Sequence, residues 1–201
     1  MQRRSLKQAR IWDDCESRAN LNSQNGTPMA PRVVARGDRP TGCYDPTMLP
    51  PPSDWPRLSA ALFYDDPRSA IDWLCKAFGF SVRLLVDGPN GSVAHSELEY
   101  GGAMIMVAGV PTTPLPEGQA WRGRFASPAL AGDKVTASMA IYIENVDEHC
   151  AQARAAGGEI VSEPADVDYG PDHWRDRNYG VADCEGHLWW FMQRLSGQAK
   201  S

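Results

Sequence analysis

Residues 61–82, ALFYDDPRSAIDWLCKAFGFSV, and residues 140–161, AIYIENVDEHCAQARAAGGEIV, align without a gap when the chain is shifted by 79 positions. Few residues are identical, but each stretch has an apolar strand-like run, a capping residue, a helix-length segment and a glycine stop. Asp66 and Pro67 are typical of a helix start, since Asp caps free N–H groups and proline suits the first helical position. Gly79 is typical of a helix end. This internal repeat predicts two copies of one structural unit.

The segments after each copy have the character of strands. Three short strands follow the first helix within residues 80–110, separated by the turn sequences GPNG and GG. In the second half a strand at 159–164 precedes two more, which we expect within residues 172–190, DHWRDRNYGVADCEGHLWW. Residues 111–134 are rich in Pro, Gly and Ala and predict a long loop between the halves. The order β-α-β-β-β therefore occurs twice.

Composition is that of an ordinary globular chain. The 201 residues are 42% hydrophobic and 22% charged. There is no apolar run of about 18 residues, and the N-terminus lacks the apolar core of a signal peptide, so we expect a cytoplasmic protein that does not act at a membrane. The five cysteines form no C-x-x-C pair, which favours neither a disulfide framework nor a zinc knuckle.

Charge and proline are distributed unevenly. Residues 1–56 carry a net charge of +2 and half of the 16 prolines, whereas the remainder carries −7. An acidic body lacks the basic face that phosphates require, so we expect no nucleic-acid partner. The proline-rich start has too little apolar surface to offset ordering entropy. The predicted organisation is a disordered or loosely attached segment at 1–55, a domain at 56–195 with modules at 56–110 and 135–195, and a tail at 196–201.

Three motifs carry a resemblance to a known family: AIDWLCKAFGF (70–80), AHSELEYGGAMIMV (94–107) and DRNYGVADCEGHLWWF (176–191). With them the chain resembles the vicinal oxygen chelate superfamily, which includes glyoxalase I, bleomycin-resistance proteins and extradiol dioxygenases. The last motif is similar to the family's closing hairpin, with Cys184 in place of a proline. The resemblance spans 56–195 and implies an α+β fold in which two βαβββ modules form a curved half-barrel cavity. That fold hosts lyases, dioxygenases, transferases and drug binders.

The resemblance also implies where a metal would bind. Metal-dependent members place a His, Gln or Glu ligand on the first and last strand of each module. The residues at these four places are Ser59, Met106, Ser138 and Trp190. Two hydroxyls, a thioether and an indole are not a ligand set for zinc, nickel or iron. We therefore expect no metal and no cofactor.

Apolar and aromatic side chains with a few polar groups are expected to line the cavity, as in small-molecule pockets generally. The residues expected to bind ligand are Ser59, Phe63, Met104, Met106, Ser138, Tyr142, Tyr169, His173, Trp174, Leu188 and Trp190. Residues 169–174 would form a loop that closes over the ligand. The alternative is a collapsed core without room for a ligand.

A polar group on one strand provides the candidate catalytic residues. His95, Glu97 and Glu99 alternate and therefore share one face of the strand. One interpretation makes His95 or Glu97 a general base, because His titrates near neutrality and burial can raise the pKa of Glu. The other makes all three rim residues that are solvated or paired with Arg. His187, just after the predicted Asp183–Gly186 turn, is interpreted as a structural hydrogen-bonding residue.

These observations predict a metal-free protein that binds a hydrophobic or aromatic small molecule in the cavity between its modules. Relatives of the bleomycin-resistance type are often dimers whose cavity spans the subunits, so the resemblance implies a homodimer. One alternative is a metal-dependent enzyme, lactoylglutathione lyase-like or a dioxygenase, with ligands relocated to His95, Glu97 and His173. Another is a structural or interaction module without a ligand. Whether any reaction is catalysed stays open.

Overall fold

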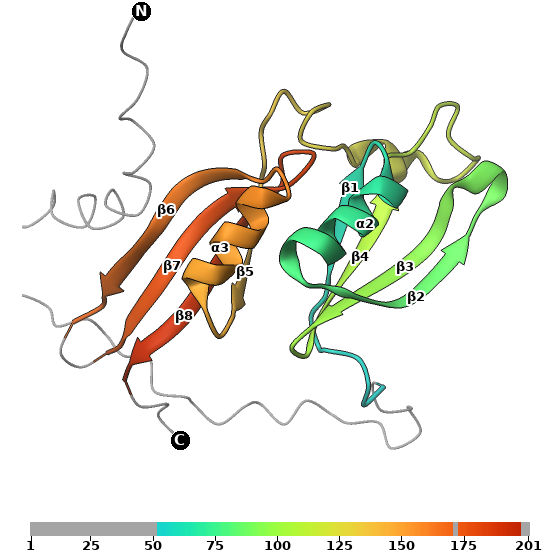
Figure 1. Ribbon diagram of the computed structural model, residues 1–201. Helices are drawn as coiled ribbons and strands as arrows, with labels where there is room; N and C mark the ends of the chain where they lie inside the picture. Colours follow the sequence, from blue (N-terminus) through green and yellow to red (C-terminus); the bar gives the residue numbers. More distant parts are fainter. Residues whose placement is uncertain (1–51, 171–172, 198–201) are drawn as a thin grey trace, which may run out of the picture. The chain divides into compact units, whose positions relative to one another are not determined.

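The duplicated order of strand, helix and three strands is present in the computed structural model, which describes residues 52–170 and 173–197 (Figure 1). The first module contains β1 (Ala60–Tyr64), α2 (Pro67–Phe78), β2 (Ser81–Asp87), β3 (Val93–Tyr100) and β4 (Ala103–Gly109). The second contains β5 (Ser138–Tyr142), α3 (Val146–Ala155), β6 (Glu159–Asp168), β7 (Arg175–Ala182) and β8 (Leu188–Ser196). The segment predicted to be disordered or loosely attached, residues 1–55, lies outside the described residues as far as position 51.

Each module forms a four-stranded mixed sheet. The strand orders are β1-β4-β3-β2 and β5-β8-β7-β6, and in both the first and last strands of the module pair in parallel. The α+β fold of two βαβββ modules is thereby confirmed. Among the described residues, no helix has the length and apolar character needed to cross a membrane.

The predicted caps explain why the helices begin where they do. Asp66 accepts a hydrogen bond from the backbone N–H of Ser69 at 3.1 Å, and Asn145, 79 positions later, accepts one from Glu148 at 3.2 Å. Each bond satisfies one of the free N–H groups of the first helical turn. The first helix ends at Gly79 in the left-handed conformation, with φ +78°. The repeat is therefore structural as well as sequential.

The two modules share one hydrophobic core, formed by the helix-covered faces of both sheets. Phe78, at the end of α2, lies 5.3 Å from the ring of Trp189 and 4.9 Å from that of Phe191, both on β8. His149 on α3 joins the same group, with Nε2 at 3.1 Å from the carbonyl oxygen of Phe78 and Nδ1 at 2.6 Å from the hydroxyl of Tyr179. The modules thus pack through their helical sides.

The predicted turn after β7 is confirmed and also bonds to the first module. Asp183 Oδ1 accepts from the backbone N–H groups of Glu185 and His187, and Gly186 has φ +94°. The other carboxylate oxygen of Asp183 accepts from the hydroxyl of Tyr64 at 2.6 Å and from the indole of Trp189 at 3.0 Å. The side chain of Glu185 accepts from two backbone N–H groups at the start of α2.

His187 completes this turn as a structural residue. Its Nε2 lies 3.0 Å from the carbonyl oxygen of Phe63 in β1, and because a carbonyl only accepts, this nitrogen is the donor. The interpretation of His187 as a hydrogen-bonding residue is confirmed. The turn therefore fixes the first module to the second with buried polar contacts as well as apolar packing.

Candidate functional site

The sheet faces opposite the helices carry the residues predicted to bind a ligand. Neither Met106 nor Trp190 belongs to the core cluster, and both are half-buried. Because the modules pack through their helix-covered faces, these two residues lie on opposite sides of the shared core. Within one chain, the predicted lining residues therefore form two separate faces, one for each module.

Equivalent rows of residues cross the two faces. Strand pairing sets Met106 opposite Ala61 and, continued by one residue from the Leu98–Ile105 pair, opposite Glu97. In the second module the corresponding row is Ala140, Trp190, Gly180 and Ser162. Ser138 pairs with Leu188 at the start of β5, and Ser59 lies one residue before β1.

The first face contains a buried carboxylate. Glu97 is 7% exposed, and its two oxygens are met by His95 Nε2 at 3.0 Å and Arg83 Nη1 at 3.2 Å. A buried carboxylate requires such partners, because its desolvation would otherwise be costly. Arg83 also reaches the sulfur of Met104 at 3.8 Å. The structure therefore brings His95 and Glu97 together and leaves Glu99 exposed.

Aromatic side chains from the connecting loop cover part of the first face. Phe125 stacks on Phe63 with ring centroids 4.1 Å apart and an angle of 10°, and Trp121 meets Phe125 edge-on at 5.8 Å. Trp121 is 55% exposed and Phe125 40%. Neither loop residue was predicted from the sequence. The available signal was a Trp and a Phe four positions apart in a segment otherwise rich in Pro, Gly and Ala.

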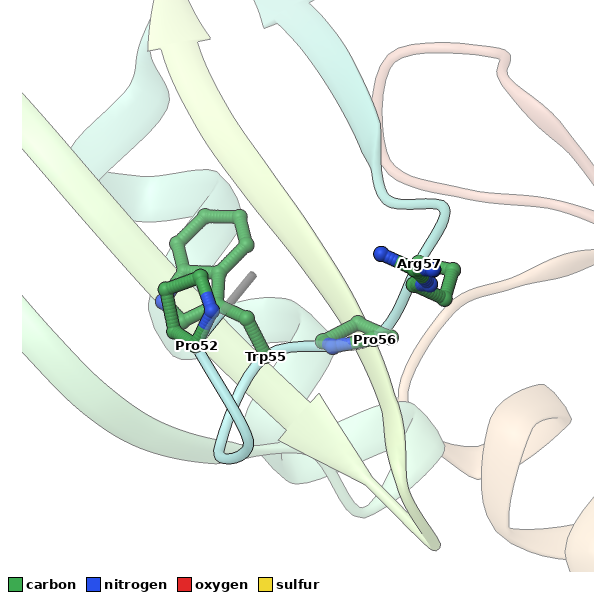
Figure 2. A pocket seen from close by; sticks show the side chains of 4 residues that line it. All are labelled: Pro52, Trp55, Pro56 and Arg57. Carbon is green, nitrogen blue, oxygen red and sulfur yellow. The ribbon is translucent and has the colours of Figure 1, made fainter. Parts of the chain in front are cut away.

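The approach to β1 also meets this face. Asp54 pairs with Nη2 of Arg83, whose other terminal nitrogen contacts Glu97. The neighbouring residues line a hollow of about 390 Å³, in which Figure 2 shows Pro52 beside Trp55, with Pro56 and Arg57 leading on toward β1. None of these residues was predicted from the sequence to belong to a site.

The second face is built around Trp190, which lies against Gly180. A Cβ added at Gly180 would be 3.0 Å from the Trp190 ring and 3.1 Å from Val161 Cγ2. Glycine lets the indole approach the β7 backbone this closely, because a larger residue would require the ring or Val161 to move by a few tenths of an ångström. Trp190 thus presents an aromatic surface at a position where the family resemblance implies a metal ligand in other members.

A second buried carboxylate lies near the end of this face. Asp176 is 1% exposed and accepts from the Tyr142 hydroxyl at 2.8 Å and from Arg194 Nε at 2.5 Å. The pKa of Tyr142 is raised, mainly by burial and next by the hydrogen bond to Asp176. The Arg194 guanidinium lies 4.8 Å from the ring centre of Trp174 and 5.1 Å from that of Tyr142. A hollow of about 560 Å³ beside this group is lined by Tyr142, Ile143, Glu144, Gln193 and Arg194.

The loop predicted to close over a ligand is the hairpin turn between β6 and β7. The Tyr169 N–H donates to the Trp174 carbonyl at 3.0 Å, and their rings lie 5.4 Å apart. His173, in the same turn, does not join His95 and Glu97. In the described part of the chain, no three His, Cys, Asp or Glu residues are arranged to hold a metal ion. The hypothesis of relocated ligands therefore has no ligand set among these residues.

Two βαβββ modules with helices on one side of each sheet define a class of duplicated α+β proteins. Comparison with known families places the chain within that class. Residues 58–191 match the Glyoxalase/Bleomycin resistance protein/Dioxygenase superfamily, and the chain belongs to this family.

The chain is also similar to individual proteins. The uncharacterized protein Rv0887c of Mycobacterium tuberculosis is 33% identical over 135 residues, which cover 67% of this chain and 72% of the relative. A Mycobacterium bovis relative, Mb0911c, is equally similar over 80% of its length. Among solved structures, TioX from Micromonospora sp. ML1 is 29% identical with a TM-score of 0.50, covering 72% of this chain and 100% of TioX.

Proposed function

We propose that this protein binds a hydrophobic or aromatic small molecule on the helix-free faces of its sheets, without a metal ion. The observation that carries the proposal is the Trp190 surface over Gly180, which occupies an implied metal-ligand position with an indole. An indole offers a large rigid area for stacking on a planar molecule and does not bind divalent metals. Phe63, Met104 and Met106 add apolar side chains to the first face, beside the buried Glu97.

The proposal includes a homodimer. The two faces of one chain lie on either side of the shared core, so one chain cannot place Met106 and Trp190 on the walls of one cavity. A second copy can set its second-module face opposite the first-module face of its partner. The ligand would then lie between a charged wall with Glu97 and an aromatic wall with Trp190. Each dimer would contain two such cavities, as two-fold symmetry requires.

A thermal-shift screen of planar aromatic compounds, followed by tryptophan-fluorescence titration, tests the binding. Trp190→Ala should weaken the affinity for a hit by about 1–3 kcal/mol, the typical contribution of an aromatic stacking contact. Trp190→Phe, which retains a ring, should lose less. Light scattering should give the mass of a dimer. Unfolding of Trp190→Ala, together with a screen that yields no hit, would show that Trp190 is a core residue.

Elemental analysis of the purified protein tests the metal-free part of the proposal. We expect no stoichiometric divalent metal, and no rise in melting temperature when zinc, nickel or iron is added back. One tightly bound metal per chain that is lost in His95→Ala would favour the lyase or dioxygenase alternative instead.

A second candidate function, metal-independent proton transfer, rests on the His95–Glu97 contact. A carboxylate 3.0 Å from one imidazole nitrogen fixes the ring's orientation, and the His95 side chain is 41% exposed toward solvent. This is the arrangement of a general base held by an acid. If such a reaction exists, Glu97→Gln should lower kcat more than it weakens binding. Equal loss in both would assign Glu97 to binding alone.

A further inference from the structure

Arg83 connects two carboxylates with very different surroundings. Glu97, on one side, is 9% exposed in its side chain and is also held by His95. Asp54, on the other side, is 67% exposed and belongs to the approach segment before β1. The Arg83 side chain is 26% exposed. One terminal nitrogen is therefore anchored within the first face, and the other points to a carboxylate at its edge.

The anchored half and the outward half have different consequences. Removing the partner of a buried acid is costly, so the Arg83–Glu97 contact keeps the guanidinium in place. An ion pair with a mostly exposed carboxylate contributes little to stability, because water and salt screen it. The N–H groups of Arg83 that point toward Asp54 are therefore held in position, and their interaction with Asp54 is weak. A planar guanidinium binds carboxylate, sulfonate or phosphate groups in this way.

The surroundings of Asp54 combine aromatic and cationic groups. Trp55 is half-buried and Arg57 is exposed, and both line the hollow next to Asp54 (Figure 2). On the sheet itself, Met104 touches Arg83. A molecule with an apolar ring system and one anionic group meets both of its needs here. The ring finds apolar surface and the anion finds Arg83.

Arg194, the corresponding arginine of the second face, is less available to an anionic ligand. Its Nε and Nη2 are bonded to the buried Asp176 and to the Tyr142 hydroxyl, both at 2.5 Å. Its partners are parts of the sheet and are not a displaceable segment. The contrast singles out Arg83 among the arginines on the two faces.

We propose that Arg83 is the anion-binding residue of the first face, that the ligand is an aromatic or apolar anion, and that Asp54 is a competitor built into the chain. This proposal rests on the proposed small-molecule binding and specifies its ligand class. In the free protein Asp54 occupies the place of the ligand's anionic group. Binding exchanges one carboxylate for another acidic group, and the approach segment moves away from Arg83.

Two fluorescent probes with the same aromatic framework test this with the full chain. 8-Anilinonaphthalene-1-sulfonate carries a sulfonate, and N-phenyl-1-naphthylamine is uncharged. Asp54→Asn should tighten binding of the sulfonate probe about 3- to 10-fold, because the competitor is weakened, and Arg83→Gln should loosen it about 10-fold. Binding of the uncharged probe should stay within about twofold in both variants, since no charge is involved.

Asp87→Asn is the matched control. Asp87 is 75% exposed and pairs with Arg68 at 2.5 Å, so the substitution makes the same change in net charge away from Arg83. It should leave binding of both probes unchanged. Equal tightening by Asp87→Asn and Asp54→Asn would overturn the proposal, since net charge alone would then explain the effect.

The remaining outcomes separate the two proposals. The uncharged probe could bind while the affinity for the sulfonate probe is unchanged by Asp54→Asn and Arg83→Gln. The proposed anion site would then be wrong, but the proposed small-molecule binding would still hold. If neither probe binds any variant, both the proposed function and the anion site are overturned. Arg83→Gln removes a partner of buried Glu97, so Arg83→Lys is measured as well. It keeps the charge but loses the planar fork, and should give an intermediate affinity for the sulfonate probe.

Discussion

At the centre of the first face Met106 lies between Ala61 and Glu97, and at the centre of the second Trp190 lies between Ala140 and Gly180. The two rows differ in what surrounds the central side chain. In the first row the strand beside Met106 carries the buried acid Glu97, and in the second a large aromatic ring lies over a glycine. The helix-covered sides of the same strands, by contrast, are apolar in both modules. The repeat has kept the packing side and diverged on the free side.

The turns between the last two strands differ as well. In the second module, Asp183 and Glu185 bond to β1 and to the start of α2. In the first, the turn consists of Gly101 and Gly102, where an added Cβ would meet nothing within 4 Å. One turn thus joins the modules, while the other lies in open space. Equivalent positions in the repeat therefore contribute unequally to stability, and the difference can be measured.

The largest effect is expected from Asp183→Ala. The substitution leaves the buried hydroxyl of Tyr64 and the indole N–H of Trp189 without an acceptor, which should cost about 3–5 kcal/mol in the free energy of unfolding. Urea denaturation measures this cost. Gly101→Ala in the other turn, at φ +52°, should cost about 1 kcal/mol or less through backbone strain alone. A smaller loss for Asp183→Ala than for Gly101→Ala would contradict the unequal roles of the turns.

The second effect compares the central rows. Gly180→Ala places a methyl group 3.0 Å from the Trp190 ring, and such overpacking should cost about 1–3 kcal/mol. Trp190→Met introduces the residue of the first module and removes the ring, although Val161 Cγ2 stays 3.1 Å from the added methyl group. Gly180→Ala should therefore cost much less in the Trp190→Met background, and a double-mutant cycle of unfolding free energies gives the coupling. Additive effects of the two changes would show that Trp190 does not require the glycine.

The elements themselves could be predicted from the sequence because local chemistry determines them. The Asp66 and Asn145 caps mark helix starts, and the Asp183–Gly186 turn is closed by its own side chain and by one left-handed glycine. In the strand that follows the turn, Trp189 belongs to the core cluster and Trp190, one residue later, does not, as the two-residue period of a strand requires. These features depend on neighbours within a few residues.

The packing of the two modules against each other depends on contacts between residues far apart in the sequence, and it was not predicted. Nothing local to Phe78 indicates that it meets Phe191, and so the placement of the two free faces on opposite sides of the core was missed. The pairs Asp54–Arg83 and Asp176–Arg194 were missed for the same reason. Each is an ordinary charged residue in its own segment and acquires a role only through its distant partner.

The third effect concerns the hairpin turns. The turn between β6 and β7 places Trp174 against Arg194, whereas the corresponding turn of the first module is the short helix Pro89–Gly91, without an aromatic residue. Trp174→Ala should lower the free energy of unfolding by about 0.5–1 kcal/mol, as expected for a cation–π contact near the surface. Trp174→Phe should retain part of it. The matched change Tyr169→Ala, in the same turn, should cost less because Tyr169 is 45% exposed and no cation from the described residues lies over its ring.

The smallest effect is a dependence of stability on pH that arises from one helix alone. Helix α3 carries His149 where α2, 79 positions earlier, carries Ala70. The Nε2 of His149 donates to the Phe78 carbonyl, and in the neutral ring Nδ1 accepts from the Tyr179 hydroxyl. Burial lowers the pKa of His149 below its ordinary value of 6.5. The unfolded chain therefore takes up this proton more readily than the folded one.

The stability that neutral His149 contributes should be complete above pH 6.5 and should decrease as the pH falls below that value. Urea denaturation between pH 8 and pH 5 measures the decrease, with His149→Gln as the control that retains polar atoms but does not titrate. We expect the difference in unfolding free energy between the two proteins to change in favour of the variant as the pH falls. If the unfolding free energies of the two proteins changed in parallel with pH, the acid sensitivity would come from groups other than His149.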